Sequence, residues 1–366
     1  MLKIKNCGPI EFRQYAKEKK IYVWGAGTAL ESCLDIYFSS QSLELILDNN
    51  SKIWGQTVQH NGDDVLIGGR DQLVQHISKN GCENSLLMIT SPYYGPDIIA
   101  DLDKVVELDG LECFLQAVIR NTKEEYKPYS FSLGQQLIPK KIHYIWIGEN
   151  PLPEKFQTNI ETWKKYNPDY EIIQWNESNY DFMKCDYIKE AYESKCYSFA
   201  SNYARLDIVH EHGGIYLDTD VECVANFDKL LNDKAFFNMG CADRINMGCG
   251  FGSVAKSNIL KDMLVTFSGN HFLLQDGTPG RRSFSTFVNP ILRRQGFELE
   301  NYYQKIDGVV LYPCEVMSPK TINGMPDFTS ENTVSIHQES GTWQNDAEWA
   351  GLAKLEKFIK ERVVLQ

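Results

Sequence analysis

The chain has 366 residues, of which 43% are hydrophobic and 23% are charged, as in a globular protein with room for two domains. Its formal net charge of −12 excludes a chain-wide basic surface and argues against nucleic acid as a partner. The ten cysteines stand singly, without a Cys-x-x-Cys pair, which favours buried thiols over disulfides or a zinc site.

The sequence contains no run of about eighteen apolar residues, the length that a membrane-spanning helix requires. Its N-terminal segment lacks the apolar core of a secretory signal. We therefore expect a cytoplasmic protein. Peripheral association with the inner face of a membrane stays open as an alternative, because a local basic patch can exist within an acidic average.

The N-terminal part begins with a Rossmann-like pattern over residues 20–49. An apolar strand leads into a turn at Gly25–Gly27, a helix follows, and a second strand ends at Asp48, where an acidic residue can bind a ribose. The fingerprint is incomplete, because Leu30 takes the third glycine position. Two interpretations stay open: a nucleotide or dinucleotide site, or a structural module that docks a partner or self-associates.

Further elements alternate along the N-terminal part. The pattern predicts helices at 70–78 and 97–102 and strands at 85–90 and 104–107. This alternation is typical of a small doubly wound sheet, so we expect a Rossmann-like accessory domain over residues 1–128. Its last residues, 123–128, are polar, end in proline and are the predicted linker.

A second α/β domain is expected over residues 129–366. It opens with a strand at 137–148, and a helix at 154–166 and a strand at 170–175 follow. Trp146 lies near the carboxyl end of the first strand, where open α/β sheets bind ligands. We therefore favour an aromatic platform for a ligand over a position in the core.

The centre of this domain is residues 196–221, which begin as a helix with Ser198 as its expected N-cap. Asn202 and Arg205 are three residues apart and therefore share one helix face. Gly213-Gly214 is expected to end the helix, because paired glycines permit a left-handed C-cap.

A short strand at 215–217 follows and runs into Asp218 and Asp220. Residues two apart in an extended chain point to the same side, so both carboxylates can face one point. Two carboxylates are suited to a hard divalent cation that holds a diphosphate. An Asp-x-Asp pair alone is common, but here it is joined to an arginine-bearing helix and a Gly-Gly break.

With these residues the chain resembles the family 32 glycosyltransferases and, more distantly, the glucosyltransferase domain of the large clostridial toxins. The shared pattern is Ser-Asp, then Arg, then Gly-Gly-x-Tyr-x-Asp-x-Asp. In this chain it reads Ser201-Asn202, Arg205, Gly213-Gly214, Tyr216, Asp218 and Asp220. The resemblance extends over residues 137–345. Asn202 departs from the pattern, because it stands where relatives have Asp.

The resemblance implies a GT-A type domain and a metal-dependent, retaining glycosyltransferase. It would move a hexose or N-acetylhexosamine from a UDP-sugar donor to a saccharide acceptor, with a lipid-linked surface-polysaccharide precursor as the favoured acceptor class. Its metal would be Mn²⁺ or Mg²⁺, held by Asp218 and Asp220. Together with Arg205, these are the residues expected to act in catalysis.

The resemblance also assigns binding roles. Trp146 would stack on the uracil ring, while Asn202 and Arg205 would bind the sugar. The remaining expected donor contacts are Tyr216, Asp218, Asn246 and Trp343.

The last part of the domain is expected to complete the site. Segments 309–315 and 333–343 resemble the closing strands of the family, and they place His337 as a third metal ligand or as a donor to the diphosphate. Imidazole suits Mn²⁺ better than Mg²⁺. The tail from 347 to 365 has the pattern of an amphipathic helix.

Two other functions are compatible with the sequence. A NAD-dependent oxidoreductase or epimerase would use the N-terminal Gly25-x-Gly27, although no Tyr-Lys or His pair with suitable spacing accompanies it. A catalytically silent sugar-binding scaffold would explain Asn202. Metal-dependent hydrolysis of a UDP-sugar would separate both from a glycosyltransferase.

Overall fold

The structure is a computed structural model that describes residues 1–27, 29–124, 128–240, 244–280, 282–322, 325–338 and 346–363. The chain divides into two compact units. Unit 1 comprises Met1–Glu125, Thr321–Pro326 and Gln344–Gln366, and unit 2 comprises Tyr126–Lys320 and Asp327–Trp343.

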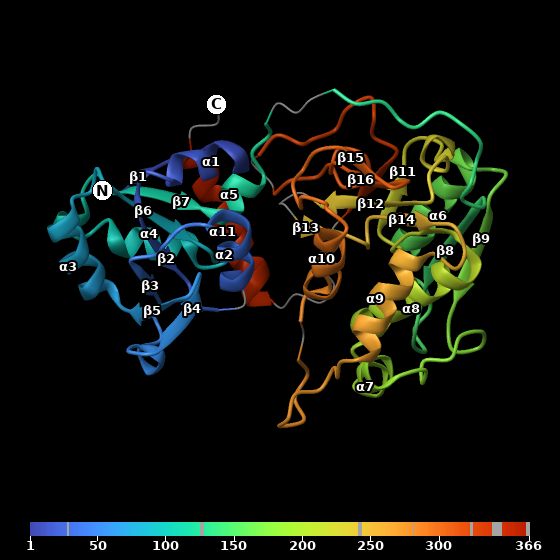
Figure 1. Cartoon of the computed structure of the whole chain (residues 1–366), viewed down its shortest axis with the longest axis horizontal. Coiled ribbons are helices and arrows are strands. Elements are labelled where there is room, and N and C mark those ends of the chain that lie inside the picture. Colours follow the sequence, from blue (N-terminus) through green and yellow to red (C-terminus); the bar gives the residue numbers. More distant parts are fainter. Residues whose placement is uncertain are drawn as a thin grey trace. The chain divides into compact units, whose positions relative to one another are not determined.

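Unit 1 is built on a seven-stranded sheet in the order β1-β7-β6-β2-β3-β5-β4 (Figure 1). Its strands are β1 (Lys3–Ile4), β2 (Lys20–Trp24), β3 (Leu45–Leu47), β4 (Thr57–His60), β5 (Asp63–Gly68), β6 (Ser85–Ile89) and β7 (Glu112–Leu115). All neighbours are parallel except β4 and β5. When β2, β3, β5, β6 and β7 are numbered one to five, their order is 3-2-1-4-5, which is the Rossmann order.

Helices cover both faces of this sheet. They are α1 (Pro9–Ala16), α2 (Ala29–Tyr37), α3 (Arg70–Asn80), α4 (Gly95–Leu102), α5 (Gln116–Arg120) and α11 (Asp346–Arg362), with short 3₁₀ turns η1 (Ser51–Ile53) and η2 (Val106–Leu108). One core packs α1 and α2 against the sheet, and the other packs α3, α4 and α11. Burial from both sides explains why every residue of β6 is buried.

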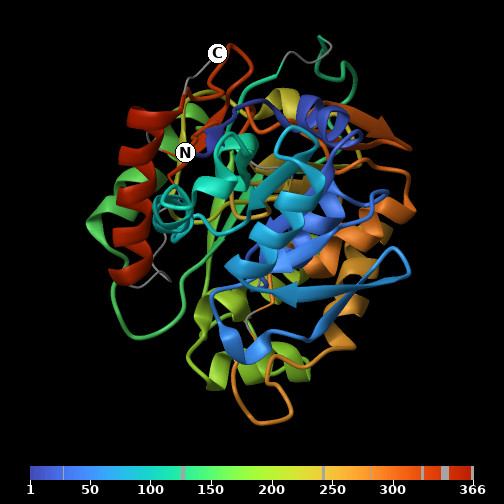
Figure 2. The same cartoon turned by 90° about the vertical axis from the view of Figure 1, so that its left-hand side faces the viewer.

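The C-terminal helix α11 lies in unit 1, whereas the sequence analysis placed it in the second domain. Leu355 and Ile359 are fully buried in the core that contains α4 (α11 is the red helix in Figure 2). Gly351 permits this close packing, because a Cβ at that position would lie 2.8 Å from the Cβ of Tyr93. The amphipathic pattern predicts the helix but not the surface it covers.

Two local predictions in unit 1 fail. The expected strand at 104–107 is replaced by η2, and the strand of this region is β7, whose four residues are all buried. The β4–β5 hairpin was not predicted, although its turn carries a clear signal. Asn61 and Gly62 both have positive φ, 51° and 90°, as an Asn-Gly hairpin turn requires.

Unit 2 contains a mixed eight-stranded sheet in the order β15-β16-β12-β14-β10-β8-β9, with β13 paired to β12. Its strands are β8 (Lys141–Ile145), β9 (Glu171–Trp175), β10 (Gly214–Tyr216), β12 (Ala235–Gly240), β13 (Arg244–Ile245), β14 (Phe251–Ser253), β15 (Gln304–Ile306) and β16 (Val309–Tyr312). β14 runs antiparallel to both β10 and β12. A separate antiparallel pair joins β11 (Val221–Cys223) to β17 (Ser335–His337).

Helices cover unit 2 as well: α6 (Glu154–Tyr166), α7 (Asp186–Glu193), α8 (Tyr197–His212), α9 (Asn258–Ser268) and α10 (Phe284–Arg294), with the 3₁₀ turn η3 (Asp228–Leu230). One core contains residues of α7, α8, α9 and α10, and a second core contains residues of α6. The predicted α/β organisation is confirmed: a mixed α/β domain is preceded by a small Rossmann-like domain.

The central helix α8 begins and ends close to its predicted limits. Its N-cap is Cys196 rather than Ser198, which lies inside the helix. The helix ends as expected at Gly213 and Gly214, with φ values of 64° and 107°. At Gly214 an added Cβ would also meet the backbone oxygen of Lys141 at 2.8 Å, so the neighbouring strand β8 requires glycine here.

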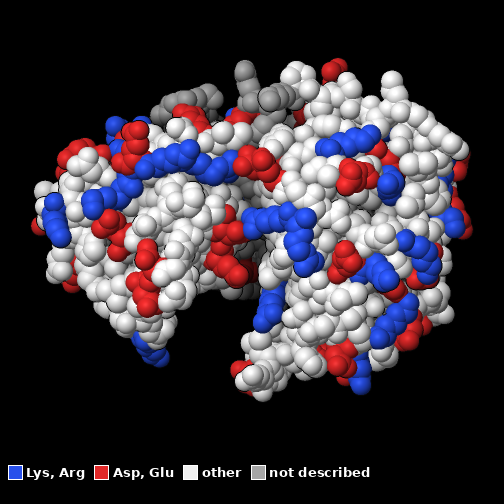
Figure 3. Space-filling view, viewed as in Figure 1, with Lys and Arg blue, Asp and Glu red and all other residues white. Residues whose placement is uncertain are grey.

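The described part of the chain has no helix that is both long and apolar enough to cross a membrane. On the face shown in Figure 3, acidic and basic side chains are interspersed.

Candidate active site

The Asp-x-Asp motif lies at the carboxyl edge of the unit 2 sheet. β8 and β10 are parallel neighbours, with Tyr216 opposite His143, and Leu217 N–H donates to the His143 carbonyl at 3.0 Å. Asp218 follows β10 and Trp146 follows β8, so both leave the sheet at the same edge. This is the edge at which open α/β sheets bind ligands.

Asp218, Asp220 and His337 converge, as the resemblance implied. Each offers a ligand atom, and these atoms all lie within 4.8 Å of one another. His337 ends β17 and lies directly opposite Val221 in the β11–β17 pair, which brings its Nε2 within 3.1 Å of Asp220 Oδ1. Two carboxylates and an imidazole fit Mn²⁺ by donor type, and the imidazole makes Mg²⁺ less suitable.

Arg205 connects helix α8 to the motif. Its side chain is 7% exposed, and its Nη2 lies 3.2 Å from Asp218 Oδ1. Ser201 holds the same guanidinium, because its carbonyl and hydroxyl accept hydrogen bonds at 3.2 and 3.0 Å. Burial is the largest single influence and by itself would lower the pKa of Arg205, but Asp218, Tyr216 and Asp220 together outweigh it, and the pKa is raised. Arg205 is therefore a fixed positive charge beside the motif.

Tyr216 holds the same carboxylate from the strand side. Its hydroxyl donates to Asp218 Oδ1 at 2.8 Å, and its ring lies 4.7 Å from the Arg205 guanidinium. Burial raises the pKa of Tyr216 well above its ordinary value. The residue therefore acts here as a hydrogen-bond donor rather than a base.

Gly248 is a site-forming residue that the sequence analysis did not identify. Its carbonyl accepts from Asp218 N–H at 3.0 Å, and a Cβ at this position would lie 2.3 Å from Asp218 Oδ2. Asn246 shapes the same turn, because its Oδ1 accepts from the N–H groups of Gly248 at 3.0 Å and Cys249 at 3.3 Å. Gly248, Gly250 and Gly252 lie close together in the sequence, which is typical of a turn, but this spacing does not reveal the approach of Gly248 to a carboxylate.

The other predicted residues lie as follows. Trp146 is half-buried, its indole N–H donates to the Asn150 carbonyl at 2.8 Å, and its ring packs edge-to-face on Phe156. Asn202 is half-buried on α8, one turn before Arg205. Trp343 lies outside the described residues.

The acidic residue of the N-terminal Rossmann-like pattern, Asp48, forms hydrogen bonds with the backbone around the glycine turn. Asp48 accepts hydrogen bonds from the N–H groups of Ala26 at 2.9 Å and Asn50 at 2.8 Å. Leu30, in the third glycine position, is 6% exposed and packs in the core. The carboxylate expected to bind a ribose is thus held in place by backbone N–H groups of its own unit, one on each oxygen.

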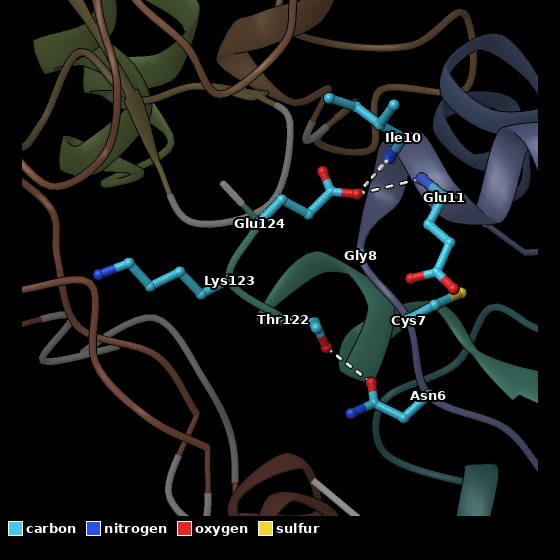
Figure 4. A pocket seen from close by; sticks show the side chains of 8 residues that line it. All are labelled: Asn6, Cys7, Gly8, Ile10, Glu11, Thr122, Lys123 and Glu124. Carbon is cyan, nitrogen blue, oxygen red and sulfur yellow. Dashed lines mark hydrogen bonds between the residues drawn. The ribbon is translucent and has the colours of Figure 1, made fainter. Parts of the chain in front are cut away.

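Unit 1 also has an open pocket of about 390 Å³, shown in Figure 4. Glu124 points to the N-terminus of α1, where its Oε1 accepts from the N–H groups of Ile10 and Glu11 at 2.9 and 3.1 Å. None of the predicted site residues lines this pocket. Because Glu124 already occupies the helix N-terminus, we assign no ligand to it.

A comparison with known families identifies the segment that contains the motif. The family described as "Glycosyltransferase sugar-binding region containing DXD motif" matches residues 153–237. The segment around the motif is therefore similar to a DXD glycosyltransferase region. The match includes Asn202, Arg205, Asp218 and Asp220, and it confirms the resemblance that the sequence analysis drew from them.

Curated relatives match parts of the chain. Inositol phosphoceramide mannosyltransferase 3 of Schizosaccharomyces pombe is 35% identical over 115 residues, covering 30% of this chain and 32% of the relative. Subversion of eukaryotic traffic protein A of Legionella pneumophila is 26% identical over 198 residues, covering 46% of this chain and 28% of the relative. The chain thus spans about a third of the length of these relatives.

Among solved structures, the PaToxG glycosyltransferase is similar with 23% identity and a TM-score of 0.33, covering 44% of this chain and 76% of that chain.

Proposed function

We propose that unit 2 is a metal-dependent, retaining glycosyltransferase that moves a hexose or N-acetylhexosamine from a UDP-sugar to a saccharide acceptor. The observation that carries this proposal is the convergence of Asp218, Asp220 and His337, with Arg205 bound to the first of them. A lipid-linked saccharide is the acceptor class that we favour. Two relatives are named mannosyltransferases, so mannose is included among the candidate hexoses.

In this mechanism Asp218, Asp220 and His337 would hold Mn²⁺. The same three residues would hold Mg²⁺ less well, because an imidazole is a less suitable ligand for Mg²⁺. The cation supplies positive charge that stabilises the diphosphate as it leaves the sugar. Tyr216 and Arg205 orient the Asp218 carboxylate through bonds of 2.8 and 3.2 Å. Because both are buried, the carboxylate is held in place before the donor binds.

The remaining residues would bind the donor. Trp146 would present its ring to the base at the carboxyl edge of the sheet, and Asn202 would contact the sugar from α8. Asn246 holds the turn that carries Gly248, and its contribution to the donor site is to shape this turn. Trp343 is proposed to close over the nucleotide.

The test is release of nucleoside diphosphate by the full chain. The donors are UDP-hexoses, UDP-N-acetylhexosamines and GDP-mannose, each with Mn²⁺, Mg²⁺ or a chelator. We expect metal-dependent hydrolysis of at least one donor, and a loss of at least about a hundredfold in Asp220→Asn. Asp262→Asn, an exposed change on α9, is the matched control and should retain full activity.

Binding of UDP-sugar without release from any donor would instead favour the silent scaffold. Hydrolysis that persists in chelator would show that the carboxylate–imidazole cluster does not hold a required metal.

A further inference from the structure

One face of helix α6 lies along the chain segment that carries the Asp-x-Asp motif. Asn159 donates a hydrogen bond from its Nδ2 to the carbonyl of Thr219 at 2.9 Å. One helical turn later, Trp163 donates from its Nε1 to the carbonyl of Val221 at 2.7 Å. Thr219 is the middle residue of the motif, and Val221 follows its second aspartate. Helix α6 therefore bonds to the backbone on both sides of Asp220.

The two hydrogen bonds fit the repeat distances of a helix and an extended chain. Four residues advance a helix by about 6 Å, and two residues advance an extended chain by about 6.6 Å. Side chains four residues apart on α6 can consequently reach carbonyls two residues apart in the segment. Asn159 is 8% exposed and Trp163 is fully buried. The bonds thus form largely away from water, where a carbonyl without a donor costs free energy.

The backbone of the motif is held at each of its three residues, but not by the same kind of group. Asp218 N–H donates to the Gly248 carbonyl at 3.0 Å, and the Asp220 carbonyl accepts from Gln338 N–H at 2.9 Å. These are bonds between backbone groups. The Thr219 carbonyl instead accepts from the side chain of Asn159. The position of the motif therefore depends on the residue type at position 159, outside the carboxylate–imidazole cluster.

We propose that Asn159 is a positioning residue for the metal site, which raises the affinity for Mn²⁺ by fixing the peptide between the two aspartates. The inference rests on the proposed function, because it requires that the cluster binds a cation. Asp218 and Asp220 flank Thr219, so a shift of the Thr219 peptide groups moves both carboxylates. Metal ligands must lie within about 0.2 Å of their ideal distances. Groups that orient the ligands typically change metal affinity by about ten- to a hundredfold.

The test is Asn159→Ala in the full chain. Mn²⁺ alone, without a sugar donor, is titrated into each protein and followed by calorimetry. We expect the Kd for Mn²⁺ to rise about tenfold, because the carboxylates lose their fixed spacing. The melting temperature of the metal-free protein should also fall, since the Thr219 carbonyl loses its donor. A control must therefore separate metal affinity from stability.

Asn167→Ala is the matched control. Asn167 follows the same helix, is 1% exposed, and accepts through its Oδ1 from Phe227 N–H at 2.9 Å. This bond holds the same chain segment, but beyond strand β11 and away from the motif. We expect Asn167→Ala to lower the melting temperature as Asn159→Ala does and to leave the Kd for Mn²⁺ unchanged.

Two smaller changes repeat the comparison if either alanine variant does not fold. Asn159→Ser keeps a polar group, but its side chain is too short to reach the Thr219 carbonyl. Thr162→Val keeps the shape of the side chain and removes the hydroxyl that accepts from Cys223 N–H at 2.9 Å. We expect a raised Kd for Mn²⁺ in Asn159→Ser and the wild-type Kd in Thr162→Val.

Donor hydrolysis provides an independent measurement. The activity lost in Asn159→Ala should shrink as the Mn²⁺ concentration is raised, because the variant lacks bound metal rather than a group that acts on the sugar. A loss that stays constant at all Mn²⁺ concentrations would show that Asn159 has only a structural role and would overturn the inference.

The inference would also be overturned by a wild-type Kd for Mn²⁺ in Asn159→Ala, or by equal rises in Asn159→Ala and Asn167→Ala. Neither result would affect the proposed function. Mn²⁺ binding by wild type without release of nucleotide from any donor would overturn the proposed function alone. Failure of wild type to bind Mn²⁺ would overturn both.

Discussion

The guanidinium of Arg205 and the carboxylate of Asp218 meet at 3.2 Å, although one residue belongs to a helix and the other follows a strand. The Gly213-Gly214 break makes this possible, because it turns the chain directly from α8 into β10. The pair places a buried positive charge beside the first carboxylate of the motif. The geometry of the Arg205 side chain should therefore matter more for activity than its positive charge alone.

Arg205→Lys tests that geometry. Lysine keeps the charge but cannot reproduce the two-nitrogen contact with Asp218 together with the bonds to Ser201. We expect kcat/KM for donor hydrolysis to fall by about ten- to a hundredfold, or roughly 1.4–2.8 kcal/mol. Lys354→Arg, an exposed change on α11, is the control for altering a basic side chain. Wild-type activity in Arg205→Lys would show that charge alone suffices.

Gly248→Ala tests the close approach to Asp218. The added methyl group would lie 2.3 Å from Oδ2, so the carboxylate or the turn must move. We expect a loss of metal-dependent activity of about tenfold or more, because displacement of a ligand by about 1 Å is costly. Gly269→Ala at the end of α9 adds a methyl group with no contact closer than 3.4 Å, so it should leave metal-dependent activity unchanged. The measurement is the activity of both variants as a function of Mn²⁺ concentration. Equal curves for Gly248→Ala and Gly269→Ala would contradict the prediction.

A buried histidine should make stability depend on pH. His143 is fully buried, its Nε2–H donates to the Gly213 carbonyl at 2.8 Å, and its Nδ1 accepts from the Trp175 indole at 3.1 Å. Burial, as the main cause, lowers the pKa of His143 from 6.5 to about 4. The unfolded chain therefore binds this proton more readily, and stability should fall as the pH decreases from about 6.5 to about 4.

The expected loss through His143 is up to about 3 kcal/mol across this range. Denaturant unfolding at several pH values measures it. His143→Gln does not titrate, so its unfolding free energy should change less with pH over the same interval, whatever its absolute stability. Parallel pH profiles for wild type and His143→Gln would contradict the assignment.

Unit 1 is predicted not to take part in catalysis. The dinucleotide fingerprint is incomplete, because Leu30 fills the third glycine position and packs in the core, and no suitably spaced Tyr-Lys or His pair accompanies the turn. We expect NAD to leave donor hydrolysis unchanged and Asp48→Asn to retain full activity. An NAD-dependent rate, lost in Asp48→Asn, would instead support the oxidoreductase or epimerase alternative. Stopped assays with and without NAD distinguish these results.

The sequence by itself determined the local chemistry of the site. Asp218 and Asp220 share a side because extended chain has a two-residue period, and Asn202 and Arg205 share a face because a helix repeats every 3.6 residues. The break at Gly213-Gly214 follows from the same kind of short-range sterics. The alternation of strands and helices likewise predicted two α/β units, apart from the misplaced strand near β7.

Only the tertiary structure decided which distant segments complete the site. His337 reaches Asp220 through the β11–β17 pair, and Gly248 reaches Asp218 through a turn after β13. Helix α11 likewise joined unit 1 rather than the domain that precedes it in the chain. Such contacts depend on which apolar faces pack together over the whole core, and periodicity along one segment carries no information about its partner.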